Sequence, residues 1–199
     1  METCSGSNYW GRELIALGFT VKLIPPQYVK PFVKGNKNDR NDALAITEAA
    51  RRPQLRGVQP RSLAQTDMIQ VHRARERIVG QRVALSNQIR GFLAEYGVVL
   101  PRGKQPLLDA LPRLLEDADN GLTVSARQLI DSLWDEWRQL DAKVRHYDQQ
   151  IGQQAKQNPS ARRLMTIHGV AEKTATAAIA FMGEGYQYRH GRHFAANLG

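Results

Sequence analysis

The sequence is poor in cysteine and has no long apolar run, and each shortage excludes a class of protein. Cys4 is the only cysteine among 199 residues, so the chain can form no internal disulfide and no thiolate metal cluster. No stretch approaches the roughly eighteen consecutive apolar residues of a membrane span, and no basic-then-apolar run near Met1 is typical of a signal peptide. We therefore expect a cytoplasmic protein without a membrane-spanning part.

Acidic residues are too few to balance the basic ones, so the formal net charge is +9. Residues 28–62 hold eight Lys or Arg against three acids, and residues 73–90 hold five Arg against one acid. Residues 109–148 instead hold nine acids against five bases. This segregation favours nucleic-acid contact by the first two blocks and a solvated structural helix for the third. The residues expected to contact nucleic acid are Lys30, Lys34, Lys37, Arg40, Arg51, Arg52, Arg73, Arg75 and Arg82.

The chain has enough apolar residues for a buried core, since they make up 42% of it. Apolar side chains at helical spacing predict a helix over residues 8–17, which Gly18 ends. Residues 19–24 form a β-rich run that two prolines stop, and residues 39–51 are expected to be helical up to Pro53. This order predicts that the front of the chain is part of an α/β layer.

A long helix is predicted over residues 64–96, which contain no proline. Apolar residues recur there every seven positions from Val71 to Phe92, as in a helix that packs along one seam. Arg75 and Arg82 occupy seam positions that should be apolar. Part of the seam is therefore expected to meet solvent, acidic side chains or phosphate.

A second long helix is predicted over residues 125–154, after a connection at 97–121 that proline and glycine interrupt. Its apolar side chains alternate in steps of three and four, which is the heptad pattern of a coiled coil. The pattern is made by Ile130, Leu133, Trp137, Leu140, Val144, Tyr147 and Ile151. We expect this stripe to be buried against the chain's own core, against helix 64–96 as an antiparallel hairpin, or against the same helix of a second chain.

Residues 160–199 predict a smaller tail that begins with a helix, a tight turn at Gly169 and a second helix. Such a hairpin can point free backbone N–H groups at a phosphate, although glycine at a helix end is also common for packing alone. His168 is interpreted as a turn residue. His190 and His193 are interpreted as surface or phosphate-facing residues, because the sequence has no third metal ligand near them.

Two aspartates at the predicted start of helix 39–51 form the candidate chemical site. Asp39 and Asp42 stand three positions apart, so their carboxylates fall on nearly the same helix face. Beside basic residues, such a pair suits Mg²⁺, which binds carboxylate, water and phosphate oxygens together. The competing interpretation, which spacing alone favours, is that Asn38 or Asp39 caps the helix while the helix dipole stabilises Asp42.

Four segments together resemble the transposases of insertion sequences 110 and 1111, and the resemblance runs over essentially the whole chain. They are METCSG at residues 1–6, LIPPQYVK at 23–30, the NDxxDA motif at 38–43 and IHGV at 167–170. The second and third segments are the specific ones, because a glycine turn alone is common. The order of the predicted segments also agrees with the architecture of that family.

The resemblance implies a RuvC-like, ribonuclease-H-type domain with four acidic residues, then a coiled coil, then a C-terminal domain with a catalytic serine. Members of the family are recombinases that a bridge RNA guides to join donor and target DNA. By position, Glu2 matches the second acidic residue and Asp39 and Asp42 the third and fourth, so these three are the expected catalytic residues and Mg²⁺ ligands. The implied partners are DNA, a guide RNA and a second copy bound through the coiled coil, in a bacterial cytoplasm at the nucleoid.

The predicted fold class is an α/β remnant of a RuvC-like domain at 1–62, an α-helical coiled coil at 63–157 and a small helical C-terminal segment at 158–199, mainly α overall. The family's first aspartate is expected before Glu2 and its serine after Gly199. We therefore expect a chain truncated at both ends and inactive by itself. The alternative is a non-catalytic, basic coiled-coil protein that binds nucleic acid or a protein partner.

Overall fold

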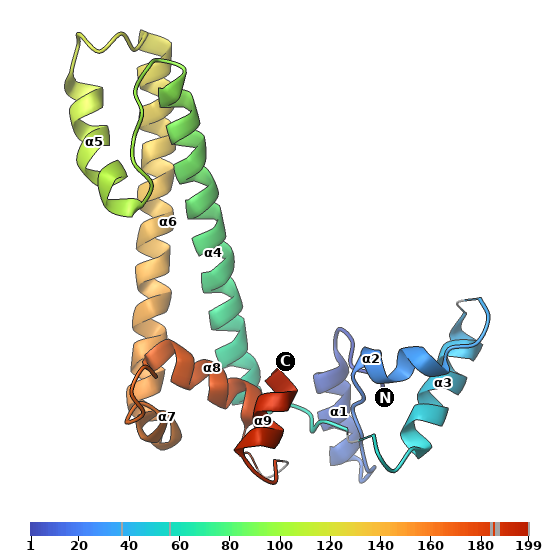
Figure 1. The fold of residues 1–199 in the computed structure, drawn as a ribbon. Coiled ribbons are helices and arrows are strands. Elements are labelled where there is room, and N and C mark those ends of the chain that lie inside the picture. The colour runs from blue at the N-terminus through green and yellow to red at the C-terminus, as the bar shows by residue number, and fades with distance from the viewer. Residues whose placement is uncertain (37, 56, 184, 186–187, 199) are drawn as a thin grey trace. The chain divides into compact units, whose positions relative to one another are not determined.

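The computed structural model describes residues 1–36, 38–55, 57–183, 185 and 188–198. Helices make up most of this part of the chain (Figure 1), and the β contacts within it are isolated bridges between single residues. The fold is therefore mainly α, as the sequence predicts. None of the described helices combines the length and the apolar character that crossing a membrane requires.

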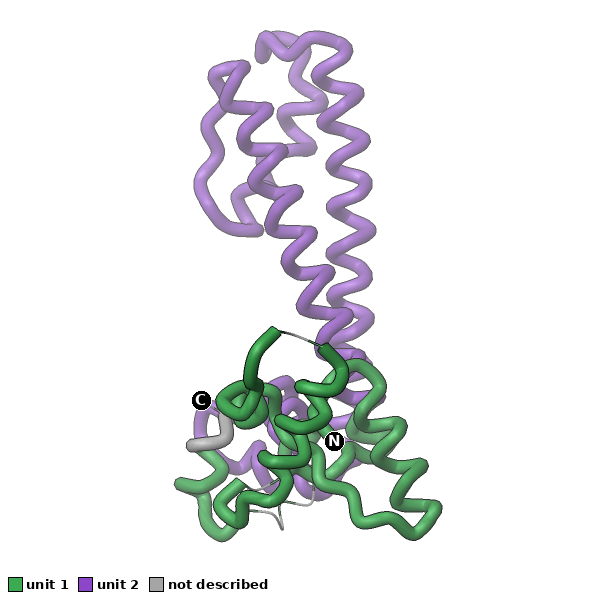
Figure 2. Tube along the Cα trace, turned by 90° about the vertical axis from the view of Figure 1, so that its right-hand side faces the viewer, with its two compact units in different colours: residues 1–66, 180–199 green, residues 67–179 purple. Residues whose placement is uncertain are grey.

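The chain divides into two compact units, which Figure 2 distinguishes by colour. Unit 1 consists of residues 1–66 and 180–199, and unit 2 consists of residues 67–179. The three domain types predicted from the sequence stay a prediction, because compactness alone does not identify a domain type.

Unit 1 begins with short helices around a small apolar core. The helices in its first segment are α1 (Ser7–Ala16), α2 (Pro26–Val29), the 3-10 helix η1 (Lys30–Phe32) and α3 (Asp39–Arg51). Ile24, Val29, Ala45 and Ala49 are buried together and form the core. Pro26 occupies the first position of α2, where its missing N–H costs no hydrogen bond. The bounds of α3 are those predicted from the sequence.

The strand predicted at residues 19–24 is wrong, because the segment forms only two isolated bridges. Ile24 pairs in parallel with Glu2, and Leu23 pairs in antiparallel fashion with Val58. A regular ladder needs neighbouring strands that run beside one another, and among the described residues only single positions pair here. The front of the chain is thus helical with two β-bridges, and a RuvC-like domain stays a prediction.

Helix α1 packs on the rest of unit 1 through its small residues. Ser7 and Gly11 are buried, whereas Tyr9 and Trp10 on the same helix are exposed. A Cβ atom at Gly11 would lie 2.6 Å from the ring of Pro60, so any larger residue would push the two segments apart. The aromatic side chains of α1 therefore face outward.

Unit 2 is built on two long antiparallel helices. The helices that lie wholly or mostly in it are α4 (Leu63–Ala94), α5 (Lys104–Glu116), α6 (Val124–Gln157), α7 (Pro159–Leu164) and α8 (Glu172–Met182). Helices α4 and α6 lie side by side in both views, and α5 lies beside them near the end where α4 stops and α6 begins (Figures 1 and 2). The two long helices predicted from the sequence are therefore present, and they form a hairpin.

The heptad stripe of α6 is buried inside this hairpin. All seven of its residues are buried or partly buried. All but Ile151 lie in or against one apolar core to which α4 contributes Ile89 and α5 contributes Leu107 and Leu111. The expected burial of the stripe is therefore confirmed, with helices of the same chain as its partners. A coiled coil between two chains stays a prediction.

Helix α5 lies inside the segment that the sequence analysis assigned to a connection, so that assignment is wrong. Its two prolines led to the wrong assignment, because proline usually indicates a break in a helix. Pro106 lies in the first turn, where a missing N–H is tolerated, and Pro112 lies inside the helix. The signal that identifies the helix is the spacing of Leu107, Leu108, Leu111, Leu114 and Leu115. The glycine- and arginine-rich tail likewise contains a short helix, α9 (Gly191–Leu198).

Candidate nucleic-acid interface and acidic site

The first turn of α3 holds the two aspartates singled out from the sequence. Asn38 precedes the helix, and its side-chain oxygen accepts a hydrogen bond of 2.8 Å from the backbone N–H of Asn41. Asn38 is therefore the cap, which confirms one part of the competing interpretation. Asp39 is exposed and Asp42 half-exposed, and neither carboxylate has a hydrogen bond or ion pair within the part of the chain that the structure describes. Both are thus available to solvent and to a ligand.

Glu2 forms an isolated parallel bridge with Ile24. Among the described residues, however, no three His, Cys, Asp or Glu side chains gather closely enough to hold a metal ion. Asp39 and Asp42 offer the oxygen ligands that Mg²⁺ prefers, but two carboxylates on one turn fall short of such a group. The described residues therefore do not fit a complete Mg²⁺ site, and the role of these three acids stays a prediction.

Most of the cations expected to contact nucleic acid are exposed. On unit 1 these are Lys30, Lys34, Arg40, Arg51 and Arg52, and on unit 2 the residue is Arg73. Lys37 lies outside the described residues. Arg52 forms an ion pair with Glu48 and lies over the ring of Phe32. Along the chain, the cations of unit 1 lie before α3, in its first turn and at its end, so positive charge is dense in the segment that holds the two aspartates.

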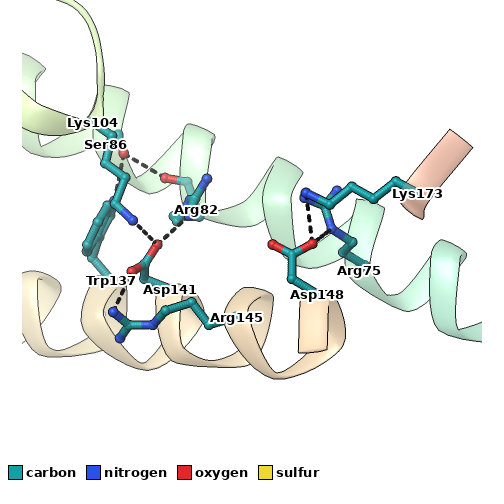
Figure 3. A network of polar contacts seen from close by, with 9 residues as sticks. All are labelled: Arg75, Arg82, Ser86, Lys104, Trp137, Asp141, Arg145, Asp148 and Lys173. Atoms are coloured by element: carbon teal, nitrogen blue, oxygen red, sulfur yellow. Dashed lines mark hydrogen bonds and ion pairs between the residues drawn. The ribbon is translucent and has the colours of Figure 1, made fainter. Parts of the chain in front are cut away.

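Arg75 and Arg82 differ from the other candidate cations because both are held by carboxylates inside the hairpin (Figure 3). The Nε atom of Arg75 donates to Asp148 at 2.6 Å, and Arg82 donates to Asp141. The sequence predicts that these seam arginines meet solvent, acidic side chains or phosphate, and in the structure both meet acidic side chains. Their contact with nucleic acid stays a prediction, but both guanidinium groups already have a counter-ion.

Asp141 is the centre of the larger of two polar clusters. Only 5% of its side chain is exposed, and it accepts hydrogen bonds from Arg82 and, at 2.7 Å, from Lys104. Arg145 lies 3.6 Å away on the exposed side. Burial by itself raises the pKa of Asp141, but the hydrogen bonds and positive charges of Lys104 and Arg82 outweigh it and lower the pKa below its ordinary value. The carboxylate is therefore charged at neutral pH.

Trp137 forms the floor of this cluster. Its indole N–H donates to the hydroxyl of Ser86 at 2.8 Å, so the only polar atom of a buried ring is satisfied. The cations of Arg82 and Lys104 lie 5.8 Å and 5.6 Å from the centre of the indole ring, within the range of cation–π attraction. The cluster thus joins α4, α5 and α6.

Asp148 is the centre of the second cluster, which joins α4, α6 and α8. It accepts a hydrogen bond from Arg75 and lies 2.9 Å from the amine of Lys173. Burial raises the pKa of Asp148, and the hydrogen bonds and charges of Arg75 and Lys173 lower it further than burial raises it. Next to it, His72 is 2.9 Å from the hydroxyl of Thr176. Burial first, and then the charge of Arg75, lowers the pKa of His72, so its neutral form is favoured.

The turn between α7 and α8 has the predicted geometry. Gly169 has a φ of +83°, a value that favours glycine, and the N–H of Val170 donates to the carbonyl of Ile167. His168 is exposed in this turn. Glu172 places a negative charge in the first turn of α8, which weakens the attraction of that helix end for a phosphate.

Known proteins resemble this chain along its whole length. Residues 4–98 match the family model for DEDD transposases of the IS110 type, which is described as a transposase. The chain is 39% identical over 199 residues to the transposase for insertion sequence element IS1111A of Coxiella burnetii, and the match covers 100% of this chain and 55% of that protein. It is 40% identical over 200 residues to a probable family 20 transposase of Pseudomonas aeruginosa, covering 100% of this chain and 59% of that one.

A third relative is the transposase for insertion sequence element IS1328 of Yersinia enterocolitica, which is 36% identical over 200 residues, with 100% of this chain and 59% of the relative covered. The chain thus spans between 55% and 59% of the length of these three relatives. No solved structure matches it. Together, the family model and the relatives confirm the resemblance drawn from the sequence: the chain is similar to IS110-type DEDD transposases, and its residues 4–98 match the model of that family.

Proposed function

We propose that this chain is part of a transposase that acts in DNA transposition. The observation that carries the proposal is its identity of 39% and 40%, over its full length, with two proteins named as transposases. In this proposal the whole protein cleaves and joins DNA under the guidance of an RNA and uses a nucleophilic serine. The chain supplies acidic residues and a nucleic-acid-binding surface to that reaction, and the covalent step requires the nucleophile of the whole protein.

The acidic turn of α3 is the proposed contribution to catalysis. The helix cap supports this proposal, because Asn38 already caps α3 and neither Asp39 nor Asp42 is needed for capping. We propose that both contribute oxygen ligands to a Mg²⁺ site of the whole protein, together with Glu2. When bound, Mg²⁺ would stabilise the negative charge that develops on a reacting phosphate.

An excision assay tests the proposal in cells. The reading frame, with its native flanking DNA on both sides, is placed on a plasmid with a marker, and the rejoined donor site is detected by amplification. We expect excision with the unchanged chain and at least a hundredfold loss in Asp39→Asn and Asp42→Asn, since catalytic metal ligands contribute several kcal/mol to the barrier. Asp67→Asn, which removes an exposed carboxylate from α4, is the matched control. Absence of excision, or excision that ignores Asp39 and Asp42, would contradict the proposal.

One observation favours a second candidate, a non-catalytic protein that binds nucleic acid or a partner. Exposed cations lie before α3, in its first turn and at its end, while the described residues hold no complete metal site. Calorimetric titration with Mn²⁺ and Mg²⁺ separates the two functions. Divalent binding that disappears in Asp39→Ala and Asp42→Ala, but persists in Asp67→Ala, supports the transposase role. Nucleic-acid binding without any such metal dependence supports the second candidate.

A further inference from the structure

The two polar clusters of the hairpin repeat at the same interval on both long helices. Arg75 and Arg82 are seven positions apart on α4, and Asp141 and Asp148 are seven positions apart on α6. Because the helices are antiparallel, a step of seven along α4 matches a step of seven back along α6. The ion pairs therefore join corresponding positions in one register (Figure 3).

A third polar contact continues the same register. Ser86 lies four positions beyond Arg82, and Trp137 lies four positions before Asp141, and these two side chains are hydrogen-bonded. In addition, each aspartate receives a lysine from the start of a third helix, Lys104 from α5 or Lys173 from α8. The clusters thus connect the register of the hairpin to the docking of its two shorter helices.

Apolar packing alone does not determine this register. The apolar side chains of both helices repeat about every seven residues, so a shift by one heptad again places apolar residues against apolar residues. Antiparallel helices with such a repeat can pair in several registers of similar apolar burial. Something other than the seam must select one of them.

We propose that the two Arg–Asp–Lys clusters select the register of the α4–α6 hairpin, and with it the positions at which α5 and α8 dock. A polar group at a seam position excludes alternative pairings, because each alternative leaves a charge without its partner. The clusters mainly destabilise the alternative registers and contribute little to the stability of the observed one. Replacing a buried ion pair by apolar residues often leaves a fold as stable as before.

A shift of one heptad in either direction meets this penalty. In one direction, Asp148 would face Met68 and Arg82 would face Trp134, while only one ion pair could re-form. In the other direction, Asp141 would face Ile89, which is fully buried, and Arg75 would face Ala155. Each shift thus places one carboxylate against an apolar side chain and also breaks the Ser86–Trp137 hydrogen bond.

The test removes both ion pairs without opening cavities. A fourfold variant carries Arg75→Met, Arg82→Met, Asp141→Leu and Asp148→Leu, which replace charged side chains by apolar ones. We expect it to keep the helix content of the unchanged chain by circular dichroism, because apolar burial is retained or increased. We also expect it to populate more than one register, which circular dichroism does not detect.

Disulfide reporters detect the register directly. Both reporters carry Cys4→Ser, which removes the single native cysteine. The first adds Val79→Cys with Val144→Cys, two positions that lie opposite each other in the observed register. The second adds Val79→Cys with Ile151→Cys, which lie opposite each other only after a shift of one heptad. Under mild oxidation, gel mobility shows which reporter cross-links within one chain.

With intact clusters, we expect the first reporter to cross-link and the second to remain reduced. In the fourfold variant, we expect the second reporter to gain cross-linking by at least tenfold. A control variant with Asp135→Leu and Arg138→Met removes a surface ion pair of α6 and should cross-link like the unchanged chain. Two results would overturn the proposal: a fourfold variant that cross-links only the first reporter, or one that loses its helix content. The second result would show that the clusters stabilise the hairpin and do not select its register.

Discussion

Asp141 shows at the scale of one residue how the hairpin accommodates a buried charge. Its carboxylate lies between cations from three helices, while Trp137 closes one side of the cluster. A buried ion network of this kind adds little net stability compared with apolar packing, but it is costly to break, because the remaining partner stays buried without a counter-ion. Removal of one member therefore has a larger effect than removal of all.

We predict that Asp141→Asn lowers the free energy of unfolding by about 3 kcal/mol. The amide has the shape of the carboxylate but leaves Arg82, of which 19% is exposed, without its negative partner. Urea denaturation followed by circular dichroism measures the change. Asp135→Asn on the same helix removes a carboxylate that is 54% exposed, so it should cost less than about 1 kcal/mol. Equal effects of the two variants would show that burial of Asp141 does not matter.

Acid should weaken the hairpin in a defined pH range. The folded-state pKa values of Asp141 and Asp148 lie below their ordinary value of 3.8, so the unfolded chain takes up protons more readily than the folded one. The stabilisation is therefore fully present above about pH 5 and is lost as the pH falls through 4 and below. Urea midpoints measured between neutral pH and about pH 3 should fall steeply for the unchanged chain. A double variant with Asp141→Asn and Asp148→Asn should show a flatter profile, and an equally steep one would refute this assignment.

Single residues were the hardest part to predict from the sequence. The acidic block that contains Asp141 and Asp148 has the composition of a solvated helix face, because charge counts do not reveal which carboxylates point into a seam. The arginines were more informative, since Arg75 and Arg82 interrupt an apolar pattern. A comparison of intervals would have identified their partners, because both pairs repeat after seven residues. Asp39 and Asp42 were placed correctly at a helix start, but a metal site also needs ligands from residues distant in sequence, which local spacing does not reveal.

At the scale of elements, we predict that Leu140→Asp disrupts the hairpin. Leu140 is buried in the apolar core that α4, α5 and α6 share, so a carboxylate there loses apolar burial and gains an unpaired charge. We expect a loss of at least about 3 kcal/mol in the free energy of unfolding, measured by urea denaturation. The neighbouring, exposed Gln139 provides the control substitution Gln139→Asp.

Light scattering of the Leu140→Asp variant shows whether the apolar stripe of α6 packs within one chain or between two chains. Packing within one chain predicts an unchanged mass after Leu140→Asp, whereas a seam between chains predicts smaller species. If helix content, stability and mass were all unchanged, the stripe would not be a packing seam.

Periodic elements were predictable because one physical requirement, burial of an apolar stripe, determines them. The heptads of α6 and the apolar and capping pattern of α3 led to the observed helices. The strand at 19–24 failed for the opposite reason, since a strand depends on partners that local sequence does not specify. Helix α5 failed because Pro112 was given more weight than its leucines, although packing in the core can offset the lost backbone hydrogen bond.

At the scale of the whole molecule, we predict nucleic-acid binding that weakens steeply with salt. The formal net charge of +9 and the exposed cations around α3 provide phosphate contacts, each of which contributes about 0.9 to the slope of log affinity against log salt concentration. Fluorescence anisotropy with a short labelled duplex, and with an RNA of the same length, measures this slope. The same affinity at low and high salt would exclude phosphate contact as the basis of binding.

A triple variant locates the contact on unit 1. Lys30→Ala, Lys34→Ala and Arg40→Ala together should reduce the salt slope by up to about 3, because they remove three exposed cations. Arg138→Ala is the control, since its charge already pairs with Asp135 in the acidic block. A slope that changes by the same amount per charge removed, three charges against one, would assign the effect to net charge alone.

The three tryptophans give each unit its own spectroscopic signal, so no added label is needed. Trp10 in unit 1 is 58% exposed, whereas Trp134 and Trp137 of α6 are buried and stacked, with ring centres 5.1 Å apart. An exposed indole emits at longer wavelength and is quenched by iodide, while a stacked pair gives a coupled signal in near-ultraviolet circular dichroism. Iodide quenching therefore reports on α1 and the coupled signal reports on the hairpin, so the unfolding of the two units can be followed separately in one unmodified sample.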